Sequence, residues 1–409
     1  MGTFTVAADM NFDMNTKETW LNNNVLVVGT SGSGKTRTVV EPNLLKAEGS
    51  YVVSDPKGLL YKKYGDYLRL RGYRVEVVDF THPDCGSNYS PFAFVRNETD
   101  VIKLSHLLVG EVENGRVDPF WDHSSEVLVS ALISYMVTCK KERDRNLRTL
   151  LDLVGLCYRR DTGISDMDII MKKVENDKPG CFTARQYNKV RLSPSKTFNS
   201  ILATVESKLG IFDCDSLASM LSTNEIDISE LCSTFRNETR RTLPGTFALF
   251  VIVSDTDRCM DRLANIFFSQ ILQEMVRFAD EFGTDGSLNV PVRFFLDDFA
   301  TNVAIDNFPR MISSIRSRNM SVALMVQAES QLEALYGRDA QTIVGNCDTY
   351  VYLGGNDVQT ARAVSERANL PLSRVLELPT DQCIVFRRGT KPVITKKYEK
   401  TEEKEVFSE

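Results

Sequence analysis

The stretch Gly29-Thr30-Ser31-Gly32-Ser33-Gly34-Lys35-Thr36 constrains the fold more than any other part of the chain, because it fits the P-loop pattern G-x-x-x-x-G-K-[ST]. It follows the apolar run NVLVVG and precedes a segment with helical spacing, which is the strand–loop–helix context that the pattern requires. Glycines let the backbone wrap around a phosphate, so that N–H groups and the helix N-terminus face the negative charge. Lys35 then reaches the terminal phosphates, and the Thr36 hydroxyl binds Mg²⁺. We expect phosphate contacts from Gly29, Thr30, Ser31, Gly32, Ser33, Gly34, Lys35, Thr36 and Arg37.

A P-loop protein also needs a carboxylate on another strand to hold Mg²⁺, and the apolar run at 292–296 ends in two acids. Asp297 is the candidate for the metal, and Asp298 is the candidate that polarises the attacking water. The alternative is that both acids simply cap the turn after the strand.

Three further polar features have a functional and a structural interpretation. Gln327 follows the run SVALMVQ and is a candidate γ-phosphate sensor, or a surface residue after a core strand. Arg316 and Arg318 lie between the two runs and are candidates for a finger that reaches a neighbouring subunit, although isolated arginines are usually solvated or paired. The run Asp55-Pro56-Lys57-Gly58 either lines the nucleotide site or forms an ordinary turn, and the turn is favoured.

Apolar runs and helical segments alternate over residues 24–80 and again after residue 246, which predicts an α/β domain with a mostly parallel sheet. Helical spacing dominates between Asp100 and Arg241, which predicts an inserted all-α domain. We place the first part of the motor domain at 1–98, the helical insertion at 99–243, the second part at 244–398 and a charged tail at 399–409. The charge-dense stretch from about Thr395 onward is expected to be frayed.

Net charge and composition limit the kinds of partner that the chain can bind. Lys and Arg number 49 and Asp and Glu 55, so the net charge of −6 excludes a uniformly basic nucleic-acid coat. A polyanion must therefore bind a local basic patch, and the helical insertion contains clusters of basic residues. Acidic neighbours of these residues equally favour an ordinary solvated surface. The nine scattered cysteines are typical of reduced thiols, and the absence of a long apolar run predicts a soluble chain. The basic residues are Lys140, Lys141, Arg143, Arg145, Arg148, Arg185, Lys189, Arg191, Lys196, Arg236, Arg240 and Arg241.

The order of motifs resembles the coupling proteins of type IV secretion systems, the ATPases of conjugative DNA transfer. The resemblance rests on NVLVVGTSGSGKT, SYVVSDPKG, the segment Asn88–Phe92, DPFWDHSSEVLVSALISYMV, SPSKTFNSILATVESKL, VIVSDTD, FLDDFAT, IRSRNMSVALMVQ and VYLGGNDVQTAR, and it covers about Asn24 to Tyr398.

This resemblance implies a RecA-like P-loop motor with an all-α domain, ATP and Mg²⁺ as ligands, and a homo-hexamer with ATP between subunits. The implied partners are single-stranded DNA with its relaxase, components of the secretion channel, and the cytoplasmic face of the bacterial membrane through an N-terminal anchor not present in this chain. By position, Lys35, Thr36, Asp297, Gln327 and Arg316 match the family's P-loop pair, Mg²⁺ acid, sensor and trans-acting arginine.

Two positions depart from the family pattern. Members commonly have Glu where this chain has Asp298, and a further Glu where it has Leu59. The shorter acid requires the water to sit closer, and we still expect catalysis. Two alternatives stay open: a receptor that docks relaxase or effector proteins and uses nucleotide only as a switch, and a double-stranded DNA pump, which the long helical insertion fits poorly.

Overall fold

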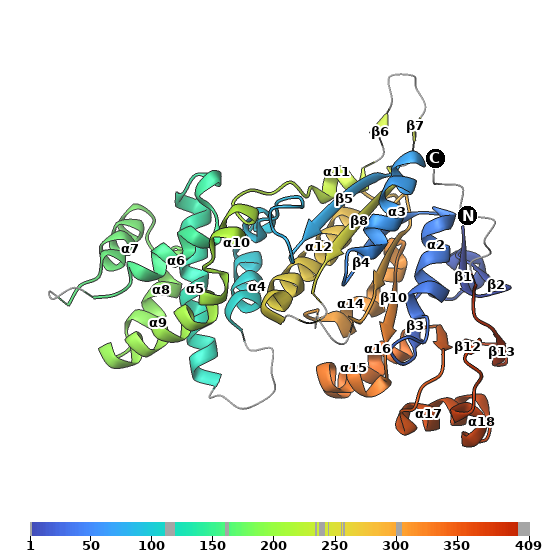
Figure 1. Ribbon diagram of the computed structural model, residues 1–409. Coiled ribbons are helices and arrows are strands. Elements are labelled where there is room, and N and C mark those ends of the chain that lie inside the picture. Colours follow the sequence, from blue (N-terminus) through green and yellow to red (C-terminus); the bar gives the residue numbers. More distant parts are fainter. Residues whose placement is uncertain are drawn as a thin grey trace. The chain divides into compact units, whose positions relative to one another are not determined.

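The computed structural model describes residues 2–110, 119–159, 163–233, 235–236, 242–243, 245–254, 256, 258–299 and 305–399. The chain separates into two compact units (Figure 1). An α/β unit comprises Met1–Thr81, Asp227–Asp261 and Ile271–Glu409, and a helical unit comprises His82–Ile226 and Arg262–Gln270. The domain boundaries inferred from sequence, at 98/99 and 243/244, stay predictions.

The α/β unit is built on a nine-stranded sheet with the order β13-β12-β11-β3-β10-β9-β4-β8-β5. The strands from β11 to β5 pair in parallel, and β12 and β13 extend one edge in antiparallel orientation. The predicted α/β class with a mostly parallel sheet is therefore confirmed. The strands are β3 (Val25–Val28), β4 (Ser50–Ser54), β5 (Arg74–Asp79), β8 (Phe247–Ile252), β9 (Val292–Leu296), β10 (Met320–Val326), β11 (Thr349–Tyr352), β12 (Gln382–Arg387) and β13 (Val393–Lys396).

Burial explains why these runs form strands. Every residue of β3, β4, β8, β9, β10 and β11 is buried, as expected for parallel strands covered on both faces. On one face the strand side chains pack in a single core with Val39 and Leu44 after the P-loop and with Leu60 and Tyr64 of the following helix. The described α-helices of this unit are α1 (Thr16–Thr19), α2 (Glu41–Lys46), α3 (Leu59–Leu70), α11 (Ile228–Cys232), α12 (Asp261–Phe282, whose first half belongs to the helical unit), α14 (Phe308–Ser314), α15 (Glu329–Tyr336), α16 (Ala340–Gly345), α17 (Val358–Ala368) and α18 (Leu372–Leu376).

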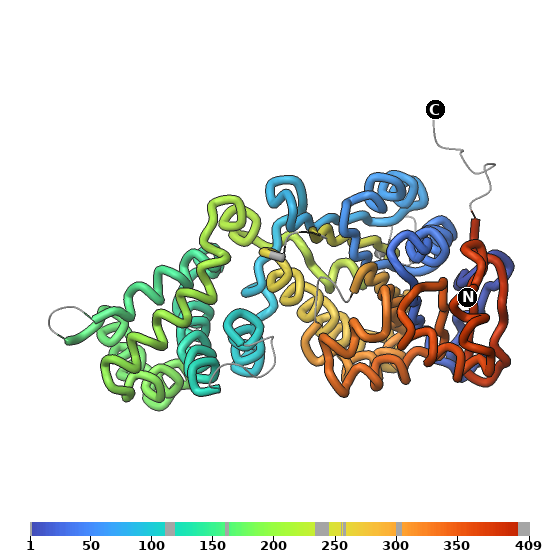
Figure 2. The backbone as a smooth tube through the Cα atoms, turned by 60° about the horizontal axis from the view of Figure 1, so that its bottom comes forward, coloured from blue at the N-terminus to red at the C-terminus, as the bar shows by residue number. Residues whose placement is uncertain are grey.

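An N-terminal hairpin of β1 (Thr3–Ala7) and β2 (Met10–Asp13) covers the same core and was not predicted. Phe4 is buried, and the Thr5 N–H donates to Asn43 Oδ1 at 2.9 Å, which holds β1 against α2. The Ala8 N–H donates to the Lys396 carbonyl at 3.1 Å, so the two ends of the described chain meet (Figure 2). The expectation that the chain frays from about Thr395 is wrong for its first residues, because β13 pairs with β12.

The helical unit contains α4 (Glu98–Val109), α5 (Pro119–Cys139), α6 (Leu147–Gly155), α7 (Asp166–Asp177), α8 (Phe182–Arg191), α9 (Ser195–Leu209) and α10 (Asp215–Met220). The predicted run of helices up to Arg241 is wrong at its end, where β6 (Phe235–Arg236) and β7 (Thr242–Leu243) form a two-stranded pair. Pro244 and Gly245 follow at once, and both residue types disfavour a helix.

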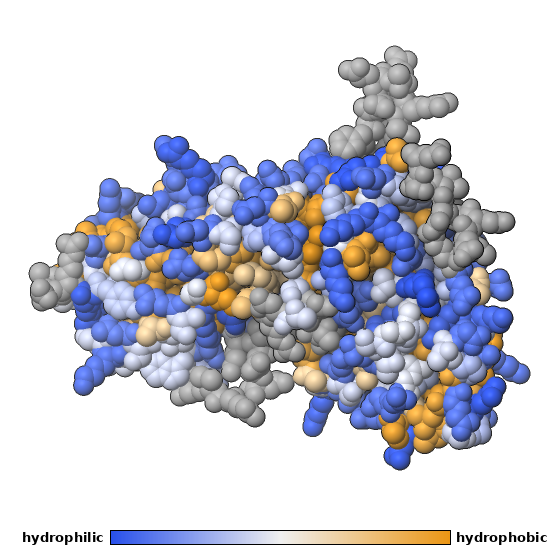
Figure 3. Space-filling view, viewed as in Figure 1, coloured by the Kyte–Doolittle hydropathy of each residue, from blue (hydrophilic) through white to orange (hydrophobic). Residues whose placement is uncertain are grey.

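No helix in the described part of the chain has the length and apolar character needed to cross a membrane. On the face shown in Figure 3, hydrophilic side chains cover most of the described surface. Most of the large apolar side chains in the described part are buried.

Candidate nucleotide-binding site

The P-loop leaves the carboxyl end of β3 in the middle of the sheet. The Gly29 N–H donates to the Val326 carbonyl of β10 at 3.1 Å, which continues the strand pairing into the loop. Gly32 and Gly34 have φ of 75° and 87°, a region that residues with a Cβ rarely adopt. The chain then turns into one π-helical turn (Thr36–Val40) and α2, so the first helical N–H groups face the loop.

Lys35 folds back over the loop. Its Nζ donates to the Gly29 carbonyl at 3.0 Å and lies 3.9 Å from Asp298 Oδ1. Only 7% of the side chain is exposed, so the ammonium group sits at the base of the site. This is the position from which a lysine can contact a terminal phosphate.

The side chain of Thr36, at the start of the helix after the P-loop, contacts the side chain of Asp297, which directly follows β9. The Thr36 hydroxyl donates to Asp297 Oδ2, and the Asp298 N–H donates to the other oxygen, Oδ1, at 3.1 Å. Burial raises the pKa of Asp297, and the hydrogen bond from Thr36 acts in the opposite direction. A hydroxyl and a carboxylate oxygen in contact form the donor set with which P-loop proteins hold Mg²⁺, which takes few protein ligands and several waters or phosphates.

Asp298 has a left-handed backbone, with φ of 48°. Successive side chains of a strand point to opposite faces, and the turn at Asp298 breaks that alternation, so that both acids line the same cleft. Asp and Asn tolerate this conformation better than other residues with a side chain.

An open cleft of about 360 Å³ collects these groups. Part of the predicted phosphate-contacting stretch lines it together with both acids, whereas Gly29, Thr30 and Ser33 are not among the lining residues. Sequence reasoning missed Glu41, which stands one helical turn after Arg37 and accepts a hydrogen bond from the Tyr64 hydroxyl at 2.6 Å. The lining residues are Ser31, Gly32, Gly34, Lys35, Thr36, Arg37, Glu41, Asp297 and Asp298.

Three other candidates do not line this cleft. Gln327 directly follows β10, beside the P-loop strand, and its N–H donates to Gln331 Oε1 at 2.8 Å. Arg316 precedes β10, at the opposite edge of the sheet, and donates to the Thr16 carbonyl at 3.1 Å. Arg318 forms a two-pronged ion pair with Asp280 at 2.8 and 3.0 Å.

The run at 55–58 behaves as a turn. Asp55 is 2% exposed and accepts from the Tyr61 N–H at 2.8 Å, so it satisfies one of the N–H groups in the first turn of α3. Burial raises the pKa of Asp55, against several backbone hydrogen bonds. Gly58 has φ of 65°, which a turn into the helix requires.

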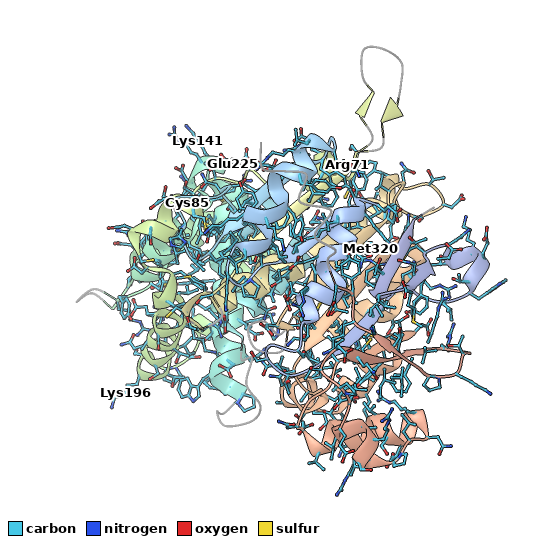
Figure 4. All side chains as sticks on the ribbon, turned by 45° about the vertical axis from the view of Figure 1, so that its right-hand side comes forward. Arg71, Cys85, Lys141, Lys196, Glu225 and Met320 are labelled. Atoms are coloured by element: carbon cyan, nitrogen blue, oxygen red, sulfur yellow. The ribbon has the colours of Figure 1, made fainter. Side chains whose placement is uncertain are left out.

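Among the described basic residues of the helical insertion, two are paired with acids and two others lie far apart. Arg191 bonds Asp168, Arg148 lies 3.3 Å from Asp213, and Lys141 and Lys196 project at opposite ends of the helical unit in Figure 4. The side chains of Arg236, Arg240 and Arg241 lie outside the described part. Within that part, no group of three or more His, Cys, Asp or Glu side chains is placed to hold a metal.

The fold and the cleft together define a P-loop NTPase with a RecA-like α/β core. The family model for type IV secretory system conjugative DNA transfer matches residues 3–369, and the chain belongs to this family. A search of curated proteins found no match.

Solved structures share the fold. The plasmid coupling protein TrwB in complex with the non-hydrolysable ATP analogue ADPNP is 16% identical, with a TM-score of 0.70 over 98% of this chain and 90% of that one. TrwB in complex with ADP and Mg²⁺ is 16% identical, with a TM-score of 0.67 over 92% and 86%. VirB4 of Thermoanaerobacter pseudethanolicus is 12% identical, with a TM-score of 0.56 over 98% and 97%. The likeness predicted from the sequence is therefore confirmed at the level of family and fold.

Proposed function

We propose that this chain is an ATP-driven coupling protein of conjugative transfer, which recruits relaxase-bound single-stranded DNA and moves it toward the secretion channel. The observation that carries the proposal is the convergence of Lys35, Thr36, Asp297 and Asp298 on one open cleft. The family assignment supports the role in DNA transfer, and the nucleotide complexes of TrwB support ATP and Mg²⁺ as the ligands.

Four residues of the cleft and one residue outside it have separate roles in this proposal. The Mg²⁺ ion, when bound, neutralises charge on the β- and γ-phosphates. Thr36 and Asp297 would hold it, since their oxygens already touch. Lys35 orients the terminal phosphate, and Asp298 accepts the proton of the attacking water. Gln327 does not line the cleft, but it follows the strand between β3 and β9 and is the candidate γ-phosphate sensor of this proposal.

Arg316 completes this site only from another copy of the chain. It lies at the amino end of β10, whereas the cleft lies at the carboxyl ends of the strands. A homo-hexamer that places ATP between subunits satisfies this requirement, and channel components and relaxase are then partners of the assembled ring.

The test is steady-state ATP hydrolysis at several protein concentrations, with and without single-stranded DNA. We expect a rate that rises with DNA and steeply with concentration, and that falls to background in Lys35→Ala. Lys62→Ala, an exposed lysine on α3, is the matched control and should behave as wild type. Nucleotide binding without turnover at every concentration would instead favour the switch-like receptor, and greater stimulation by duplex DNA would favour a double-stranded DNA pump.

A further inference from the structure

A buried lysine at the end of the last strand reaches the P-loop. Lys397 follows β13, and its Nζ donates to the Ser33 carbonyl at 2.9 Å and to the Leu353 carbonyl at 2.8 Å. Its backbone N–H donates to the Asp381 carbonyl at 2.7 Å, and 5% of the residue is exposed. The contact spans 364 positions of sequence, and Figure 2 shows the C-terminal strand beside the N-terminal segment.

The same side of the P-loop is held by the segment after β11. The Thr30 N–H donates to the Gly354 carbonyl at 3.2 Å. A Cβ on Gly355 would lie 2.9 Å from Thr30 Cγ2, so this segment packs directly on the loop. Because Lys397 bonds both Ser33 and Leu353, it ties the loop to this segment at a second point.

Packing alone does not account for a lysine here. Burial lowers the pKa of Lys397, which means that its charged form pays a desolvation cost in the folded chain. Both acceptors of its Nζ hydrogen bonds are neutral carbonyls, which compensate a buried charge less than a carboxylate does. An apolar side chain of similar length would avoid that cost, so the lysine is better explained by what it does to the loop.

The geometry of a peptide bond indicates how Lys397 acts on the loop. A trans peptide is planar, and its carbonyl and N–H groups point in opposite directions. When Lys397 holds the Ser33 carbonyl on the buried side, the N–H of Gly34 is directed to the other side, and Gly34 lines the cleft. Backbone N–H groups of this loop are the ones that contact phosphates in P-loop proteins.

We propose that Lys397 is a positioning residue of the nucleotide site, which orients the Ser33–Gly34 peptide toward the phosphates and couples nucleotide affinity to the docking of β13. This inference rests on the proposed ATP binding at the cleft. It adds a control point at the C-terminal edge strand, because coupling between two sites is reciprocal: nucleotide stabilises the docked strand as the docked strand favours nucleotide.

The first test compares Lys397→Met with Lys396→Met, a substitution of the exposed neighbour that ends β13. The Kd of a fluorescent ATP analogue and the KM for ATP should each rise roughly tenfold in Lys397→Met, the size of one lost hydrogen bond to a charged group. kcat at saturating ATP should stay within about twofold, because the reacting groups are untouched. A purely structural role would lower kcat through a smaller folded fraction and leave KM unchanged, and that result would overturn the proposal.

The second test needs no substitution at Lys397. Hydrogen exchange of the wild-type chain is measured with and without the non-hydrolysable ATP analogue, and amides of residues 393–398 should become more protected when nucleotide binds. In Lys35→Ala the change should disappear. If wild type binds the analogue and these amides do not respond, the coupling is refuted while the proposed function stands. If wild type does not bind the analogue at all, the proposed function itself fails.

Discussion

Asp298→Asn should slow ATP hydrolysis and at the same time tighten ATP binding. Asn is the replacement of choice because Asp298 has a φ of 48°, and Asn is the other residue that readily adopts this left-handed backbone. The substitution therefore removes the negative charge without adding backbone strain. The lost charge should then have two effects that can be measured separately, one on the rate of the chemical step and one on the affinity for ATP in the ground state.

The size of each effect follows from the position of the carboxylate. As the proposed acceptor of the water proton, Asp298 should contribute a factor of roughly 10² to 10⁴ to kcat. In the ground state it pairs with Lys35 at 3.9 Å and lies in the same cleft as the phosphates, so it competes for the lysine and repels the ligand. A unit charge at about 4 Å contributes between about 1 and 4 kcal/mol, and the 32% exposure of this side chain favours the low end. We expect roughly fivefold tighter binding, which corresponds to about 1 kcal/mol.

The assay combines phosphate release at saturating ATP with titration of a fluorescent ATP analogue. Asp66→Asn, at an acid that is 91% exposed on α3, is the matched control. Asp298→Glu retains the carboxylate but places a less tolerant residue in the left-handed conformation, and should lose about 1 kcal/mol of stability while it keeps measurable turnover. Hydrolysis by Asp298→Asn within twofold of wild type would refute the assignment of Asp298, whatever the binding result.

Two further substitutions test the other parts of the chain. Arg316→Ala should lower DNA-stimulated hydrolysis on the order of a thousandfold while nucleotide binding by the single chain is retained, and Arg318→Ala should have little effect because its pair with Asp280 is a surface pair. Burial opposes ionisation of Asp168, but hydrogen bonds from Arg191 and its other partners outweigh it and hold its pKa well below the usual range. Asp168→Asn should therefore cost about 1–3 kcal/mol in urea unfolding of the helical unit at pH 7. The deficit relative to wild type should begin to shrink as the pH falls below about 4 and shrink further toward the folded-state pKa, because a depressed carboxyl pKa stabilises fully above the unfolded value and the stabilisation is lost as the pH falls through the folded value. A deficit as large at about pH 2 as at neutral pH would contradict this, and the fully exposed Asp215→Asn should show no deficit.

Local patterns predicted much of the fold. The apolar runs at β8, β9 and β10 are continuous because their strands are buried on both faces, and that pattern is legible in the sequence. The hairpin β1–β2 also has a local signal, since Phe4 and Val6 alternate with polar residues before a short turn. The segment around Lys397 has no such local signal. Its charge-dense composition predicted fraying, yet Lys397 is buried because it bonds partners more than forty and more than three hundred residues away.

In the candidate site, too, some residues could be predicted from local patterns and others depend on the three-dimensional fold. Lys35 and Thr36 belong to a motif with fixed spacing, and the two acids follow a strand whose end is visible in the sequence. That Thr36 and Asp297 touch is a property of the strand order, which places β10 between β3 and β9. Glu41 and Lys397 were missed because their relation to the loop depends on helix phase and on a distant strand, and neither leaves a pattern of its own.

Arg316 cannot fill the role that the family resemblance implies for it within one chain. It lies before β10, and the cleft lies beyond that strand's carboxyl end, so the seven residues of β10 separate the two. At about 3.3 Å a residue, the separation is about 20 Å, which is more than a side chain spans. The Thr16 carbonyl further holds the guanidinium on its own side of the sheet. The role that the family resemblance implies for Arg316 therefore requires a second copy that presents its amino-end edge to the first copy's cleft. A contact between two different surfaces of identical chains is heterologous. Repeated from copy to copy, such contacts give a closed assembly only when the copies form a ring.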